Sequence, residues 1–269
     1  MSKAPSLAVR FFYSSGARTL FTRAWYALVS KLDRNADVTL MNYGFAPEDG
    51  SRIPLAPEHE GERYSIQFYH RVATAVPIEG KDVLEVGCGR GGGAAYIARY
   101  LKPKEMTGLD RTPAAIQFAR RHFAAEKNLR FIEGDAHSLP FADNSFDAVV
   151  NIESAQHYAD IDRFLREVHR VLRPGGHLLI ACFEDPSKDV YPRRSLERSP
   201  LQAVSEEDLT PGVVRAMDLD SARRLALAEK LAPSFLQGLA GEFAGVRGTE
   251  LYESFASGGC PYLFFVYRK

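Results

Sequence analysis

A short apolar run followed at once by a cluster of glycines constrains this chain more than any other feature. Residues 83–93 have the sequence VLEVGCGRGGG, in which Val83, Leu84 and Val86 are typical of a buried strand. Glycines allow a tight turn and a close approach of the backbone to a ligand. A helix is expected from about residue 94 to residue 101, with its free N–H groups directed at the turn. The stretch therefore predicts a strand, a turn and a helix around a nucleotide-like ligand.

An acidic residue in this stretch separates two possible cofactors. Gly87, Gly89 and Gly92 satisfy the dinucleotide fingerprint G-x-G-x-x-G. Glu85, at the end of the strand, is expected to face the ligand pocket, where it would repel the pyrophosphate of NAD or FAD. The same carboxylate favours a ligand with positive charge. S-adenosylmethionine has an ammonium group, a sulfonium and no phosphate, so it is the expected cofactor, with an NAD-dependent dehydrogenase as a distant alternative.

The overall composition argues against several kinds of partner. The 269 residues include 34 basic and 34 acidic side chains, so the chain has no net charge. This balance predicts neither a nucleic-acid groove nor binding to an anionic membrane surface. Arg10 interrupts the apolar stretch that a signal peptide needs, and no segment approaches membrane-spanning length. The three cysteines lack metal-ligand spacing and form no even-numbered framework. We therefore expect a cytoplasmic protein without stable membrane insertion, and the sequence leaves its oligomeric state open.

Residues 1–62 form a prefix that is rich in aromatic residues. These residues are spaced loosely, as on amphipathic helices, and include Phe11, Phe12, Tyr13, Phe21, Trp25 and Tyr26. One interpretation is a helical cover packed on the core. We favour a helical N-terminal lid over the active site, with Tyr43 and its neighbours closest to the ligand. Residues 63–269 would then form the main domain, beginning with a helix at 64–76.

From residue 81 onward, expected strands and helices alternate. The strands are predicted at 83–85, 105–109, 129–133, 146–150 and 177–183. Such alternation is typical of an α/β fold with a doubly wound parallel sheet and helices on both faces. Asp110 ends the second strand, about twenty positions beyond the glycines, where a carboxylate can accept hydrogen bonds from both ribose hydroxyls. The second strand is therefore expected to contribute to the cofactor site.

An ordered set of motifs over residues 81–183 resembles the class I S-adenosylmethionine-dependent methyltransferases. The motifs are the glycine turn after Glu85, Asp110, Gly134-Asp135-Ala136, Phe146-Asp147 and Leu172-Arg173-Pro174-Gly175-Gly176. The resemblance implies that Glu85, Gly87 and Gly89 contact the methionine portion of the cofactor. It implies that Asp110 holds the ribose and that Asp135, with Ala136 beside it, meets the adenine amino group. Arg111 and Asn151 are also assigned to the cofactor side. Asp110 and Asp135 taken singly could instead be helix N-caps.

The last third of the chain departs from the alternation. Residues 184–211 look irregular and charged, and helices are expected at about 221–231 and 234–243. The stretches 243–252 and 261–267 predict two further strands. In the methyltransferase family such an antiparallel pair completes a seven-stranded Rossmann-like sheet, and an insertion before it covers the substrate. Residues 184–240 are therefore assigned as a helical, substrate-covering insertion.

A narrower resemblance extends over nearly the whole chain. Asn42-Tyr43, Tyr69-His70-Arg71, the expanded Gly91-Gly92-Gly93 and Gly248-Thr249-Glu250-Leu251-Tyr252 resemble the actinobacterial O-methyltransferases of phthiotriol, glycopeptidolipid and fatty-acid type. This resemblance implies a hydrophobic small-molecule acceptor, such as a lipid or a polyketide-type metabolite. Tyr43 and Tyr69 are accordingly expected in the acceptor site.

The candidate catalytic residues lie just past the fourth strand. Methyl transfer to oxygen is an in-line displacement, and a base that takes the hydroxyl proton would add roughly a hundred- to ten-thousandfold. His157 is the predicted base. In sterol, tocopherol and glycoside methyltransferases, which resemble this segment, acidic and histidine residues face the acceptor, so Glu153 is the second catalytic candidate. Gln156 and Tyr158 are expected beside the acceptor, and Gln156 stands where some glycoside enzymes have a second histidine.

Other functions remain open at this point. No tight acidic cluster is seen in the late loops, so no catalytic metal is expected. O-methylation of a hydroxyl is the leading function, with a carboxyl as the alternative acceptor group. C- or N-methylation is the alternative, because Glu153 could stabilise a cation in place of deprotonation by His157. A non-catalytic S-adenosylmethionine-binding protein is a third hypothesis.

Overall fold

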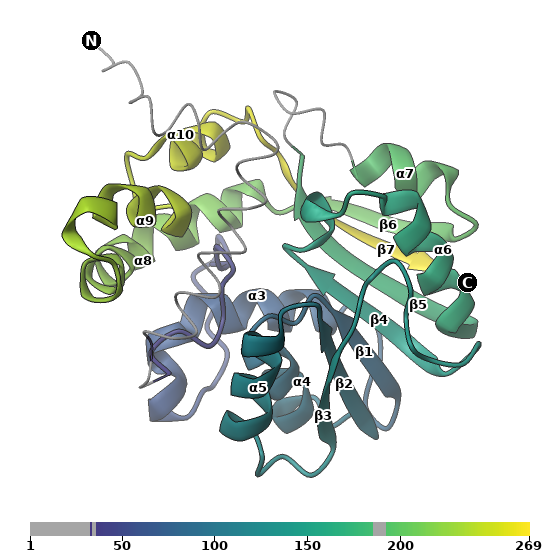
Figure 1. The fold of residues 1–269 in the computed structure, drawn as a ribbon. Coiled ribbons are helices and arrows are strands. Elements are labelled where there is room, and N and C mark those ends of the chain that lie inside the picture. The colour runs from purple at the N-terminus through teal and green to yellow at the C-terminus, as the bar shows by residue number, and fades with distance from the viewer. Residues whose placement is uncertain (1–32, 34–35, 185–191) are drawn as a thin grey trace.

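Seven strands form one mixed sheet in the part of the chain that the structure describes (Figure 1). This structure is a computed structural model, and it describes residue 33 and residues 36–184 and 192–269. The strand order is β3-β2-β1-β4-β5-β7-β6. Strands β1 to β5 are parallel, whereas β7 runs antiparallel to both β5 and β6. The strands are β1 (Asp82–Val86), β2 (Glu105–Asp110), β3 (Leu129–Glu133), β4 (Phe146–Ile152), β5 (Leu172–Phe183), β6 (Gln202–Asp208) and β7 (Tyr262–Arg268).

Helices cover both faces of the sheet, and each face has its own apolar core. On one face α3, α4 and α5 bury Phe68, Ile97 and Ile116, and on the other α6 and α7 bury Phe164 and Leu196. The predicted doubly wound α/β fold is therefore confirmed. The α-helices are α3 (Arg63–Ala73), α4 (Gly92–Tyr100), α5 (Pro113–His122), α6 (Ile161–Val171), α7 (Pro192–Arg198), α8 (Thr210–Leu231), α9 (Gln237–Ala244) and α10 (Glu250–Ala256). Short 3-10 helices are η1 (Pro57–Glu62), η2 (Ala155–His157) and η4 (Ser234–Leu236).

Strand β1 shows how the sheet sorts its side chains between the two cores. Leu84 and Val86 pack in the core beneath α6, whereas Val83 packs in the core beneath α3 and α4. Successive side chains of a strand point to opposite faces. Glu85 therefore lies on the same face as Val83, under α3 and α4, where it is fully buried.

The end of the chain corrects one prediction. Residues 243–252, expected as a strand, contain the end of α9 and the start of α10. Gly245 ends α9 in the left-handed conformation, with a φ of 64°, and the Thr249 hydroxyl caps α10 by accepting a hydrogen bond from Tyr252 N. Two such stop and start signals leave no room for a strand. The strand predicted at 261–267 is β7.

The sixth strand lies where the sequence was expected to be irregular. Strand β6 forms the edge of the sheet, and nearly all of its side chains are exposed. An edge strand with few buried side chains shows no apolar alternation, so its residues QAVSEED predict no strand. As a result, helices α8, α9 and α10 come between the last two strands instead of before them.

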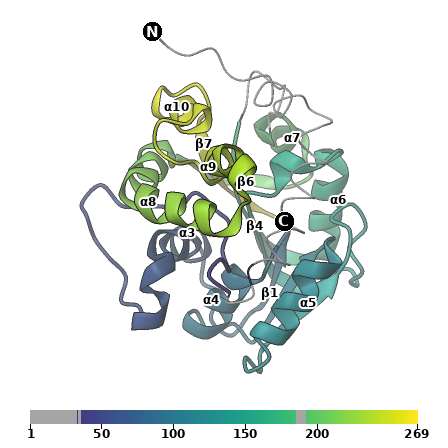
Figure 2. The ribbon, with the colours of Figure 1, turned by 60° about the vertical axis from the view of Figure 1, so that its left-hand side comes forward.

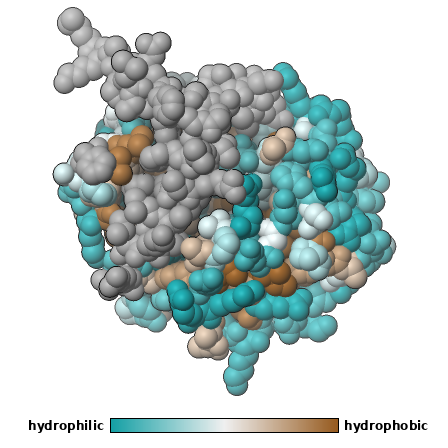
Figure 3. Space-filling model, in the orientation of Figure 1, coloured by the Kyte–Doolittle hydropathy of each residue, from teal (hydrophilic) through white to brown (hydrophobic). Residues whose placement is uncertain are grey.

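The helices inserted between β6 and β7 lie at one end of the molecule. Figure 2 shows α8, α9 and α10 together beside α3, on the opposite side from α6 and α7. In the described ranges no helix has both the length and the apolar character needed to cross a bilayer. The face drawn in Figure 3 is mainly hydrophilic where the residues are described, with apolar residues in scattered groups.

Candidate functional site

A pocket opens at the carboxyl ends of β1, β2 and β4. Four segments supply its walls, namely residues 39–42, the glycine turn at 87–90, the residues after β2 at 110–112, and the residues after β4 at 152–154. Further lining residues are Tyr69, Gly93, Ala115, His157 and Tyr158. Ligands bind at this edge in open α/β sheets because the loops that follow the parallel strands converge there. The pocket thus lies where the sequence predicted a cofactor.

The glycine turn is shaped by contacts that exclude side chains. Gly87, Gly89 and Gly91 all have positive φ, at 82°, 53° and 86°. The amides of Gly87 and Cys88 both donate to the Leu109 carbonyl, which binds the turn to the end of β2. A Cβ atom at Gly87 would lie 2.0 Å from Ser154 Oγ. Glycine at this position therefore lets the turn pack closely against the loop after β4.

Asp110 connects the glycine turn to the second strand. Its Oδ2 accepts a hydrogen bond from Gly89 N at 2.9 Å, and its Oδ1 accepts one from Thr112 N at 2.8 Å. Each carboxylate oxygen has two lone pairs, so both retain capacity to accept from ligand hydroxyls. Asp110 and Arg111 both line the pocket, with Arg111 exposed at its rim. The ribose assignment of Asp110 stays a prediction that this geometry favours.

Glu85 was expected to face the pocket, and it lies behind Tyr69, outside the lining; its contact with the cofactor stays a prediction. Tyr69, which does line the pocket, donates its hydroxyl proton to Glu85 Oε1 at 2.6 Å. The second oxygen, Oε2, is buried without a hydrogen-bond partner among the described residues. Burial raises the pKa of Glu85 to about 7. Because Glu85 shares the strand face of Val83, Tyr69 of α3 lies between this carboxylate and the cavity.

Glu153 lines the pocket in an uncommon backbone conformation. It follows β4 with a φ of 50°, a left-handed conformation that is uncommon for a residue other than glycine. Such backbone strain persists only where surrounding contacts hold it, and it is concentrated at functional sites. Glu153 Oε1 accepts a hydrogen bond from Tyr43 N at 2.8 Å. Desolvation by the surrounding protein raises the pKa of Glu153 to about 8, although the Tyr43 amide partly opposes the rise.

The rest of the segment after β4 is held by a compact hydrogen-bond network. Asn151 Nδ2 donates to the Val86 carbonyl and to the Tyr158 hydroxyl, and its Oδ1 accepts from Ala155 N. Ser154 Oγ donates to the same Tyr158 hydroxyl at 2.8 Å. His157 and Tyr158 line the pocket, whereas Asn151 is fully buried behind its wall. This network fixes the turn that carries Glu153 and His157.

Besides Glu85 and Asn151, other residues predicted to contact ligands also lie outside the pocket wall. The backbone N–H of Tyr43 binds Glu153, while its ring packs against Phe183 and Phe255, with ring centroids 6.3 Å and 5.5 Å away. Gln156 is half-buried, and its Oε1 has no hydrogen-bond partner among the described residues. Ala136 is buried in the core on the α6 face. Their predicted ligand contacts remain predictions.

Asp135 is exposed on the loop that follows β3, outside the pocket lining. Its Oδ1 accepts from His137 N at 2.9 Å and lies 2.7 Å from His137 Nδ1. The backbone hydrogen bond from His137 holds the pKa of Asp135 below its usual value. The assignment of Asp135 to adenine therefore remains a prediction.

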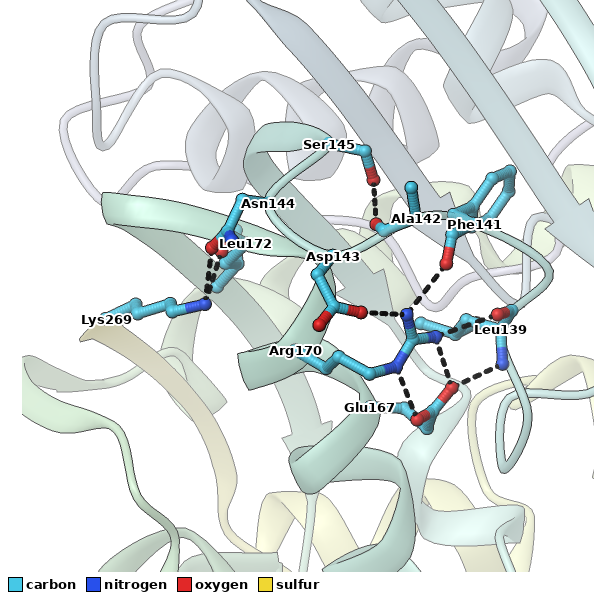
Figure 4. Close-up of polar contacts among 10 residues, drawn as sticks. All are labelled: Leu139, Phe141, Ala142, Asp143, Asn144, Ser145, Glu167, Arg170, Leu172 and Lys269. Carbon is cyan, nitrogen blue, oxygen red and sulfur yellow. Dashed lines mark hydrogen bonds and ion pairs between the residues drawn. The ribbon is translucent and has the colours of Figure 1, made fainter.

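Arg170 of α6 anchors the remainder of the same loop, as Figure 4 shows. Its guanidinium donates to the carbonyls of Leu139 and Phe141 and to the carboxylates of Asp143 and Glu167. Glu167 Oε2 in turn accepts from Leu139 N at 2.7 Å. These bonds hold the loop against α6 and keep the segment after Asp135 in one conformation.

Residues 36–46 form a segment, the strap, that supplies one wall of the pocket through residues 39–42. Glu62 Oε1 accepts hydrogen bonds from Thr39 N at 2.8 Å and Leu40 N at 3.0 Å. Asn42 Nδ2 donates to the Ser65 carbonyl at 3.2 Å, and Gly92 N donates to the Thr39 carbonyl at 3.3 Å. The strap is thus bound to η1, α3 and the first residue of α4. The aromatic residues at positions 11–26 of the predicted lid lie outside the described residues.

Sequence reasoning missed several residues that build this cover. Glu62 holds the strap, Arg224 reaches it from α8, and Arg90 is fully buried in an ion pair with Asp33 at 3.0 Å. The Arg90 guanidinium also lies 3.7 Å from the centroid of the Phe118 ring. A charged residue in a polar stretch resembles a surface residue in sequence, so only the position of Arg90 inside the glycine turn was a usable signal.

The chemistry of the lining suits a ligand with hydroxyl groups and positive charge. Asp110 and Glu153 supply two carboxylates. Of the basic side chains among the described lining residues, Arg90 is already engaged by Asp33, and Arg111 lies at the rim. Two carboxylates in the pocket wall, with Arg111 only at the rim, disfavour a pyrophosphate. The residues present therefore fit S-adenosylmethionine better than a dinucleotide. Among residues 33, 36–184 and 192–269, no group of three His, Cys, Asp or Glu side chains is placed to hold a metal ion.

Comparisons with known proteins agree with this arrangement. A family model described as a methyltransferase domain matches residues 84–180. The chain is 36% identical over 262 residues to a phthiotriol/phenolphthiotriol dimycocerosates methyltransferase of Mycobacterium leprae, covering 96% of this chain and 97% of that protein. It is 38% identical over 245 residues to a fatty-acid O-methyltransferase of Mycolicibacterium smegmatis, covering 91% and 88%.

Solved structures share the fold at lower sequence identity. The [4+2]-cyclase SpnF superposes with a TM-score of 0.71 at 22% identity, covering 93% of this chain and 96% of that one. A geranyl diphosphate C-methyltransferase from Streptomyces coelicolor gives a TM-score of 0.67 at 17% identity, covering 93% and 97%. At such identities the likeness shows the fold alone.

Proposed function

The chain belongs to the S-adenosylmethionine-dependent methyltransferases, in the group of the phthiotriol dimycocerosate and fatty-acid enzymes, and we propose that it methylates an oxygen atom of a lipid-like acceptor. The relatives are named for phthiotriol dimycocerosates and a fatty acid, which supports a lipid-like acceptor. The aromatic rings of Tyr43, Phe183, Phe255 and Tyr262, which pack together beside Glu153, support an apolar environment next to the reaction site.

The observation that carries the proposal is the placement of Glu153 in the pocket. A base works best when its pKa lies near the working pH, and burial raises the pKa of this carboxyl to about 8. Its Oε1 is held by the Tyr43 amide, which keeps the carboxylate in one orientation. Glu153 follows β4 with a strained φ of 50° and lines the pocket. We therefore assign Glu153 as the group that accepts the proton of the acceptor hydroxyl.

Other residues of the chain bind and orient. When bound, the cofactor supplies a methyl group on a positively charged sulfur. Asp110 would hold the ribose hydroxyls, the glycine turn would allow close approach, and Tyr69 with Glu85 behind it would border the methionine end. His157, the base predicted from the sequence, shares the pocket with Glu153 and would orient the acceptor oxygen. Closure of the strap would exclude water from the site. The cytoplasmic location expected from the sequence stays a prediction.

Glu153→Gln and His157→Gln separate the two candidate bases. Glutamine at 153 keeps an oxygen that can accept from the Tyr43 amide and removes only the acid–base function. We expect Glu153→Gln to lower kcat by roughly two to four orders of magnitude and to leave cofactor affinity within about threefold. In wild-type protein the rate should rise with pH up to about 8, since the carboxyl must lose its proton. Turnover of fatty-acid and polyketide-type alcohols, with calorimetry of cofactor binding, measures both effects.

The reverse pattern would reject this assignment. A large loss of kcat in His157→Gln with a small loss in Glu153→Gln would make His157 the base. Methylation of a carbon or nitrogen atom in place of oxygen would replace the proposed reaction with the alternative in which Glu153 stabilises a cation. Cofactor binding without turnover of any acceptor would support a non-catalytic binding protein.

A further inference from the structure

One peptide group of the strap is bound at both of its ends by charged side chains. The carbonyl of Asn42 accepts a hydrogen bond from Arg224 Nη2 at 3.2 Å. The N–H of the same peptide group, which belongs to Tyr43, donates to Glu153 Oε1 at 2.8 Å. A cation therefore lies at the oxygen end of this peptide and a carboxyl at its hydrogen end. This is the orientation in which the peptide dipole is stabilised by both neighbours.

Arg224 is itself held rigidly by α8 and its surroundings. Its Nε donates to Asp220 Oδ2 at 2.9 Å, and its Nη1 donates to the Ala244 carbonyl at 2.9 Å. The side chain is only 8% exposed. All three nitrogens of the guanidinium are thus engaged in one buried arrangement. A buried arginine with this many contacts has a single position and so transmits that position to the peptide it binds.

The groups that face Glu153 come from several elements. Tyr43 lies in the strap and contributes its backbone N–H, while Tyr69 lies in α3, Cys182 in β5 and Tyr262 in β7. Burial raises the pKa values of Tyr69, Cys182 and Tyr262, so these three groups are neutral at moderate pH. His157 shares the pocket with Glu153. The Tyr43 amide, then the Tyr262 hydroxyl, and then the charge of Arg224 lower the pKa of Glu153 against the larger effect of burial, and of these three groups Arg224 is the permanently charged one. A residue of the helices between β6 and β7 therefore contributes to the charged state of Glu153, directly through its charge and indirectly by holding the peptide that carries the Tyr43 amide.

We infer that Arg224 is a positioning residue for the methyl transfer, which acts through the Asn42–Tyr43 peptide to hold the Glu153 carboxylate in the pocket and to favour its charged form. The inference rests on the proposed role of Glu153. It also assigns a task to α8, because Arg224 of this helix binds the carbonyl of the peptide group whose N–H contacts Glu153. The helices that follow β6 would then contribute to acid–base chemistry as well as covering the acceptor.

Arg224→Gln tests this role through the pH dependence of the rate. Loss of the cation should raise the pKa of Glu153, so the acidic limb of kcat/KM should move up by about one pH unit. At pH values below the limb, kcat/KM of Arg224→Gln should be about tenfold lower than that of the wild type. Above about pH 9.5 it should return toward the wild-type value. Arg224→Lys keeps the charge and should restore most of the profile. Arg223→Gln is the matched control, because Arg223 binds the same Asp220 on the same helix and makes no hydrogen bond to the strap in the described structure.

A second variant should shift the pH limb in the opposite direction. Asp220→Asn removes the anion that offsets Arg224, so the limb should move down by about half a pH unit. If Arg224→Gln fails to fold, this variant still decides. A limb that stays in place in a folded variant, or a rate that falls equally at every pH, would overturn the inference.

An infrared titration separates failure of the inference from failure of the proposed function. The carbonyl band of a protonated carboxylic acid that disappears in Glu153→Gln reports Glu153 directly, without turnover. We expect its midpoint to shift in Arg224→Gln by the same amount as the rate limb. A shifted band in a protein whose Glu153→Gln variant retains full activity would reject Glu153 as the base and uphold the action of Arg224. An unshifted band would reject the action of Arg224 even if Glu153 is the base.

Discussion

The two walls of the pocket differ in how they are built. The lower wall consists of turns that directly follow parallel strands, such as the glycine turn after β1 and Asp110 at the end of β2. The upper wall is the strap, which is bound by Glu62 of η1, Ser65 of α3 and Arg224 of α8. Hydrogen bonds between neighbouring turns hold the lower wall, whereas hydrogen bonds to segments distant in the sequence hold the upper one. We infer that the lower wall is rigid and that the upper wall opens to exchange ligands.

The largest effect is expected from a change at the tightest point of the lower wall. In Gly87→Ala, the new Cβ would meet Ser154 Oγ, 2.0 Å away in the present structure, and the φ of 82° would be strained. We expect cofactor affinity to fall by more than about a hundredfold, because the turn and the loop after β4 must separate. Calorimetry with S-adenosylmethionine measures this loss.

Gly89→Ala is the matched control for that variant. It has the same kind of strained φ, at 53°, but its nearest neighbour is the flexible end of Met41, 3.3 Å away. Its loss of affinity should be clearly smaller. Equal losses in both variants would show that conformational strain, and not the contact with Ser154, makes glycine necessary.

A smaller effect is expected at Asp110. Asp110→Ala removes the acceptor of the Gly89 and Thr112 amides together with the proposed ribose contacts. Cofactor binding should weaken by about 1.5–3 kcal/mol, the range for losing charge-assisted hydrogen bonds. Asp135→Ala, which changes an exposed carboxylate outside the pocket lining, serves as the comparison and should cost less. A larger loss at Asp135 would shift the main cofactor contact away from the lower wall.

The smallest effect on cofactor binding is expected from a change in the upper wall, where the expected effect is on local opening of the backbone. Glu62→Gln weakens the acceptor that binds Thr39 N and Leu40 N while keeping its shape. Hydrogen exchange of those two amides should become about tenfold faster, with cofactor affinity nearly unchanged. Glu60→Gln on the same 3-10 helix is the control, because Glu60 binds Arg63 and makes no hydrogen bond to the strap in the described structure. Unchanged exchange in Glu62→Gln would show that the strap does not depend on this carboxylate.

The lower wall was predictable because each of its parts lies in one continuous stretch of sequence. The expected strand at 129–133 has the same bounds as β3, and those expected at 83–85, 105–109 and 146–150 lie within β1, β2 and β4. An apolar run followed by glycine or aspartate contains the strand, the turn and the ligand-facing group together. The edge strand β6 escaped prediction because its side chains are exposed and show no pattern.

The direction in which individual acidic side chains point was less predictable. Glu85 was expected to border the ligand directly, whereas Tyr69 lies between it and the pocket. Strand alternation places Glu85 on the face of Val83. Strand alternation does not predict which helix covers that face. In this protein the covering helix is α3, which precedes the first strand in the sequence.

By itself the sequence determined the doubly wound sheet, the cofactor edge and the candidate residues Asp110, Glu153 and His157, because these depend on periodicity and on short spacings. Only the tertiary structure decided how Glu153 is held. Its partners are Tyr43, which precedes it by 110 residues, and Arg224, which contacts the carbonyl of Asn42 across 182 residues. No local pattern records such a contact. It forms only when the strap, β4 and α8 pack together and leave buried charges that must be paired.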